Sequence, residues 1–66
     1  MAYYNGRMLV ALQSKILDKY NIYVDIEELS ELTIRFMKLK TIDLIDLINL
    51  KDEAVYLIAD NLKMRG

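Results

Sequence analysis

The chain contains no cysteine and no histidine among its 66 residues. These absences exclude disulfide bonds, zinc or haem held by histidine or cysteine, and catalysis by a thiol or an imidazole. Any catalysis would have to rest on Asp, Glu, Lys or Tyr, and no pattern in the sequence pairs a nucleophile with a base. We therefore predict a non-enzymatic protein that binds no cofactor and no metal.

Proline is also absent, and the only two glycines stand at positions 6 and 66. Because little in such a sequence interrupts a helix, we predict one small all-α domain spanning residues 1–66. No apolar run approaches the roughly 18–20 residues that a membrane-spanning helix needs, and the first ten residues lack the features of a signal peptide. These observations favour a soluble, cytoplasmic protein.

Apolar residues, in contrast, are abundant: they make up 55% of the chain, while the formal net charge is only −1. A domain this small has much surface for its volume and buries only about 60% of the surface that its unfolded chain exposes. Apolar side chains must then remain on the surface, where large patches usually mark contacts with another chain. The composition therefore indicates a homodimer, or a complex with another protein.

The stretch from Arg7 to Tyr20 predicts a first helix, with Asn5 as its N-cap. Spacings of three and four residues place one set of side chains on a single face: Leu9, Leu12, Ile16 and Tyr20. Residues 1–5 precede this helix, and we expect them to be disordered. Asn21 tolerates the left-handed conformation that ends many helices, and residues 22–24 favour a short extended connection.

Asp25 predicts the N-cap of a second helix, with Glu28 completing a capping box. The apolar residues of this helix recur with helical periodicity: Ile26, Leu29, Leu32, Phe36 and Leu39. Arg35, Lys38 and Lys40 lie towards its C-terminal end, where the helix dipole favours positive charge. These three residues also form the main basic cluster, which could contact phosphate or an acidic partner.

The stretch that follows combines a narrow polar strip with a wide apolar surface. Thr41 can cap a third helix, in which Asp43, Asp46 and Asn49 recur every three residues and the residues between them are Ile or Leu. Such a strip covers little of the circumference, so we expect this helix to be buried nearly all round. We interpret the two aspartates as a solvated strip rather than as a cation site.

Asn49 permits a turn, after which a fourth helix is expected from about Asp52. The inner face of this helix would be Val55, Ile58 and Leu62. One continuous helix from Thr41 to Lys63 is an alternative, and a strand within residues 34–45 is another.

Together these patterns predict an all-α bundle of three to four short helices that dimerisation completes. We expect the interface with the partner to take side chains from the first helix, its connection and the third helix: Leu9, Leu12, Ile16, Tyr20, Tyr23, Ile42, Ile45 and Ile48. The leading functional hypothesis is a small regulatory or interaction module that binds another protein. A purely structural subunit of a larger assembly would have the same sequence features.

Residues 41–60 resemble the twenty-residue helix-turn-helix pattern of DNA-binding regulators. Apolar residues occupy its eighth, tenth, fifteenth and eighteenth places, and asparagine replaces glycine at the ninth: Ile48, Leu50, Val55, Ile58 and Asn49. Ile45 departs from the small residue usual at the fifth place. The resemblance implies that the fourth helix enters the major groove, although Asp52 and Glu53 would then approach phosphates. The candidate DNA contacts are Arg35, Lys38, Lys40, Lys51, Tyr56, Lys63 and Arg65.

Overall fold

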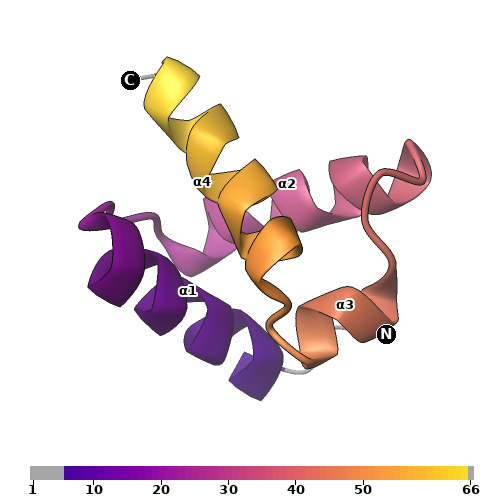
Figure 1. The fold of residues 1–66 in the computed structure, drawn as a ribbon, viewed down its shortest axis with the longest axis horizontal. Coiled ribbons are helices and arrows are strands. Elements are labelled where there is room, and N and C mark those ends of the chain that lie inside the picture. Colours follow the sequence, from indigo (N-terminus) through magenta and orange to yellow (C-terminus); the bar gives the residue numbers. More distant parts are fainter. Residues whose placement is uncertain (1–5, 66) are drawn as a thin grey trace.

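A computed structural model describes residues 6–65, and within them the fold consists of four helices and no strand. They are α1 (Gly6–Tyr20), α2 (Ile26–Lys38), α3 (Leu44–Ile48) and α4 (Asp52–Arg65). Figure 1 shows α3 between the end of α2 and the start of α4. The predicted all-α class is confirmed, and the strand alternative is wrong. The predictions for residues 1–5, including Asn5 as an N-cap, lie outside the described residues.

The end of α1 and the start of α2 fall where local sequence signals predict. Asn21 ends α1 with a φ of 57°, and its amide donates to the carbonyl of Leu17 at 2.9 Å. Asp25 caps α2, because its carboxylate accepts a hydrogen bond from the Glu28 amide at 2.8 Å. The Glu28 carboxylate pairs with Arg65 at 2.9 Å, which ties the start of α2 to the end of α4.

The connection between α2 and α3 uses residues that the sequence analysis assigned to a helix. The amides of Lys40 and Thr41 donate to the carbonyls of Met37 and Phe36, and Lys40 has a φ of 58°. This pair of bonds is the Schellman arrangement that closes a helix. Thr41 therefore belongs to the turn that closes α2 and does not cap α3. The N-cap of α3 is Asp43.

A second Schellman arrangement ends α3 after only five residues. The amides of Leu50 and Lys51 donate to the carbonyls of Leu47 and Asp46, and Leu50 has a φ of 51°. The predicted turn residue, Asn49, has a φ of −84° and is the helical C-cap. This break also rules out one continuous helix from Thr41 to Lys63.

The core combines one face of each long helix with single anchors from the shorter segments. Its fully buried large side chains are Leu12, Ile16, Leu29, Leu32, Leu47, Val55 and Ile58. α1 contacts all three other helices, so it is the central element of the bundle. Val24 and Ile42 add buried side chains from the connections, and Gln13 of α1 donates to the Val24 carbonyl at 2.7 Å.

Candidate protein-binding surface

α3 exposes most of its apolar side chains. Of its five residues only Leu47 is buried, while Leu44, Ile45 and Ile48 are 46%, 59% and 56% exposed. We call these three residues the α3 patch. Burial all round the helix was predicted, and that prediction is wrong. A helix held between two tight turns packs one side against α1 and α4, so its other side faces outward.

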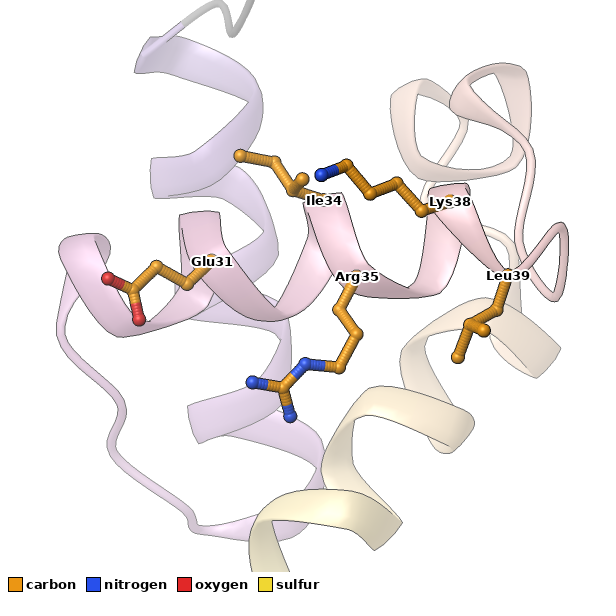
Figure 2. Close-up of a pocket in the computed structure, with 5 residues that line it drawn as sticks. All are labelled: Glu31, Ile34, Arg35, Lys38 and Leu39. Carbon is orange, nitrogen blue, oxygen red and sulfur yellow. The ribbon is translucent and has the colours of Figure 1, made fainter.

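The outward face of α2 forms a second feature, next to α3 along the chain. Five residues at helical spacing line a shallow hollow of about 380 Å³, here called the α2 hollow: Glu31, Ile34, Arg35, Lys38 and Leu39. In Figure 2, Ile34 and Lys38 extend to one side of the helix, and Arg35 and Leu39 extend to the other. The hollow thus combines aliphatic surface with two cations and one carboxylate, that of Glu31.

Charged side chains near these two features lack partners within the described residues. Arg35 and Lys38 make no ion pair with any part of residues 6–65, and neither do Asp43 and Asp46. Asp43 is the N-cap of α3, yet its carboxylate makes no capping hydrogen bond. Two free cations and two free carboxylates therefore lie on neighbouring segments of the chain.

The charges at the start of α4 are paired instead. Lys19 donates a hydrogen bond to Asp52 at 3.1 Å, and Lys51 lies 3.7 Å from Glu53. The hydrogen bond from Lys19 and its positive charge lower the pKa of the Asp52 carboxyl below its ordinary value. These pairs join α4 to α1 and to the preceding turn, so they contribute to the fold.

The residues predicted for a partner interface divide into two groups. Four of them belong to the core of the chain itself and present no free surface to a partner: Leu9, Leu12, Ile16 and Ile42. They were expected at an interface because periodicity shows which residues share a face and does not show what covers it. The exposed members are Tyr23, Ile45 and Ile48. Tyr20 is half-buried, with its ring centroid 6.4 Å from that of Tyr56.

Several residues of the α3 patch and the α2 hollow were missed by the sequence analysis as contact residues. Leu39 and Leu44 were assigned to helix faces that the structure leaves open, and Ile34 was given no role. The available signal was that these aliphatic residues are neighbours of charged residues in the sequence. Such a signal can be recognised only when it is known which face of each helix the core leaves exposed.

The candidate DNA contacts do not form one surface with a single role. Lys51 and Arg65 are in ion pairs, and Tyr56 lies beside Tyr20. The remaining four belong to the end of α2, the turn after it and the end of α4: Arg35, Lys38, Lys40 and Lys63. The first exposed side chains of α4 are Asp52 and Glu53.

A polar hollow of about 210 Å³ between α3 and α4 includes the carboxylates of Asp46 and Glu53. Residues 6–65 contain no group of three or more acidic side chains placed to hold a metal ion. None of the described helices combines the length and apolar character required to cross a membrane.

Comparison with protein-family models, with curated proteins and with solved structures finds no significant match to this chain.

Proposed function

We propose that this chain is a small non-enzymatic module that works by binding protein through the α3 patch, and that it does so as a homodimer. The observation that supports the proposal is the cluster of Leu44, Ile45 and Ile48 on one short helix, each about half exposed. Exposed aliphatic side chains that adjoin one another are typical of protein-binding surfaces. Partner binding would remove this surface from water.

The α3 patch is too small to sustain association alone. Burying the exposed half of three aliphatic side chains contributes roughly 1 kcal/mol for each. The loss of translational and rotational freedom costs about 4–15 kcal/mol. A standard interface takes about 800 Å² from each partner, which is about one sixth of the 4668 Å² accessible surface of this chain. The proposed interface must therefore include surface beyond α3.

The test is sedimentation equilibrium on the wild-type chain and on the double variant Ile45→Glu/Ile48→Glu. Wild type should show a monomer–dimer equilibrium in the micromolar range, and the variant should remain monomeric because charge replaces the buried aliphatic contact. The matched control is Val10→Glu/Leu17→Glu on α1, where the two side chains are 53% and 42% exposed. The control should dimerise like wild type. A wild-type chain that stays monomeric at every concentration would sink the proposal.

A helix-turn-helix DNA binder is the second candidate. Its supporting observation is the order of α3, a three-residue turn and α4, together with the free cations at the end of α2. Fluorescence anisotropy with a generic labelled duplex distinguishes the two candidates. DNA affinity that falls steeply between about 50 and 200 mM salt would indicate contacts with several phosphates. Absence of binding at the lower salt concentration would eliminate this candidate.

A further inference from the structure

We infer that the α2 hollow receives α3 of a second copy of this chain, with Arg35 and Lys38 of each copy facing Asp46 and Asp43 of the other. The inference rests on the proposed dimer and names both surfaces that would form it. It commits to one occupant of the α2 hollow, because α3 carries two carboxylates that can face the two cations of the hollow.

The two surfaces match in charge and spacing. Arg35 and Lys38 are three residues apart on α2, and Asp43 and Asp46 are three residues apart at the start of α3. The Cβ atoms of Arg35 and Lys38 lie about 5–6 Å apart on α2, and Asp43 and Asp46 are the N-cap and the third residue of α3. An antiparallel arrangement of α2 and α3 would therefore bring both cations opposite both carboxylates. All four charges are without ion-pair partners inside residues 6–65.

Aliphatic side chains accompany the charges on both sides. Ile34 and Leu39 line the hollow around its two cations, on opposite sides of α2 in Figure 2. The α3 patch supplies aliphatic surface on the same short helix as Asp46, which also lines the polar hollow between α3 and α4. The contact thus has an apolar part, which provides most of the association energy, and a polar part, which sets orientation and register.

A two-fold axis makes this contact occur twice in one dimer. In such an interface each copy presents the same combined surface, so α2 of one copy meets α3 of the other and the reverse. The two elements follow each other in the chain, and Figure 1 shows residues 39–43 as the loop that joins the end of α2 to α3 in each copy. The combined surface supplies the area beyond α3 that a stable dimer needs.

The experiment is a charge-exchange test by sedimentation equilibrium with the full chain. One variant is Arg35→Glu/Lys38→Glu, and the other is Asp43→Lys/Asp46→Lys. Each variant alone faces like charges in both contacts, so its dimerisation should weaken at least about 100-fold. An equal mixture should recover a dimer of near wild-type affinity, because both contacts of the mixed dimer then join opposite charges.

Three controls keep the test decisive. Lys15→Glu/Lys63→Glu alters the net charge as much as Arg35→Glu/Lys38→Glu does, but it changes neither the α2 hollow nor α3. This control should dimerise like wild type. Far-UV circular dichroism checks that each variant is folded. If the lysine variant is unfolded, Asp43→Asn/Asp46→Asn replaces it, and its dimerisation should be weaker than that of wild type and less sensitive to salt.

The outcomes separate this inference from the proposed function. If wild type dimerises and Ile45→Glu/Ile48→Glu abolishes the dimer, but both charge variants dimerise like wild type, then α3 binds elsewhere and the inference is overturned. The same follows if each variant is monomeric and the mixture stays monomeric. If wild type never dimerises, both the inference and the proposed function fail.

Discussion

Leu47 is the side chain that holds α3 against the rest of the chain, and its replacement by alanine should cost much of the protein's stability. Leu47 is fully buried, and no other residue of α3 is. A helix of five residues has no stability of its own, since isolated helices shorter than about 12–15 residues are marginal in water. The position of α3 therefore depends on this anchor and on the two turns that flank it.

The magnitude follows from the burial. A buried Leu→Ala change typically costs about 2–5 kcal/mol, depending on how far the site can collapse. For Leu47→Ala we expect about 3 kcal/mol, because the short α3 can move part of the way into the vacated space. A 66-residue domain has a total stability of roughly 3–10 kcal/mol, so the variant should be close to unfolding at 37 °C.

The assay is urea denaturation followed by far-UV circular dichroism, at a concentration low enough to keep the chain monomeric. The matched control is Ile48→Ala in the same helix, where the side chain is exposed and the expected loss is at most about 0.5 kcal/mol. Equal losses for the two variants, or a loss below about 1 kcal/mol for Leu47→Ala, would refute the assignment of Leu47 as the anchor.

Three further predictions concern single side chains. In an NMR titration the Asp52 carboxyl should show a pKa below its ordinary value of 3.8, returning towards it in Lys19→Met. Since folding lowers this pKa, the stabilisation from Asp52 should be present at pH values above the ordinary pKa and lost as the pH falls through the lowered pKa. An unchanged titration midpoint of Asp52 in Lys19→Met would contradict this. Lys40→Gly should raise the free energy of unfolding by about 1 kcal/mol, because Lys40 has a positive φ, whereas Lys15→Gly inside α1 should lower it by about 1 kcal/mol. A lower stability of Lys40→Gly in urea denaturation would be inconsistent with this. Asn61→Leu should be neutral or stabilising by about 1 kcal/mol in the same assay, since the buried Asn61 Oδ1 has no hydrogen-bond partner among residues 6–65; a loss above about 1 kcal/mol would oppose this.

The end of α1 and the start of α2 could be predicted because their signals are local. Asn21 adopts the left-handed conformation by its own preference, and Asp25 caps α2 through the amide three residues later. Both helices are long enough for their apolar periodicity to show which face enters the core. These features depend on neighbours within one or two turns, so the sequence alone contains them.

The ends of α2 and α3 could not be predicted, because the residues that close these two helices carry no such signal. Lys40 and Leu50 adopt positive φ, a conformation that their residue types rarely take, while Asn49 remains helical. Tertiary packing of Leu47 and Ile42 decides these positions. A run of Ile and Leu shows that a segment is apolar, but it does not show which of its sides another helix covers.

The sequence predicts that the protein has an exposed aliphatic surface, but it does not show which residues form all of it. The apolar excess predicts exposed aliphatic surface, and Ile45 and Ile48 were among the residues expected at an interface. The other half of the proposed contact, the α2 hollow, depends on which helical face points outward. Its cations were interpreted from the sequence mainly as a response to the helix dipole. Only the packing of the core shows that the face of α2 with Arg35, Lys38, Ile34 and Leu39 points outward.

The most direct measurement of the central claim is a dilution series of ¹⁵N–¹H correlation spectra on the wild-type chain. The account predicts concentration-dependent shifts for the amides of residues 31–39 and 43–48, with the outward residues Val10 and Leu17 of α1 unchanged. Spectra that do not depend on concentration, or shifts centred on α1, would contradict the claim that α3 and the outward face of α2 bind a second copy.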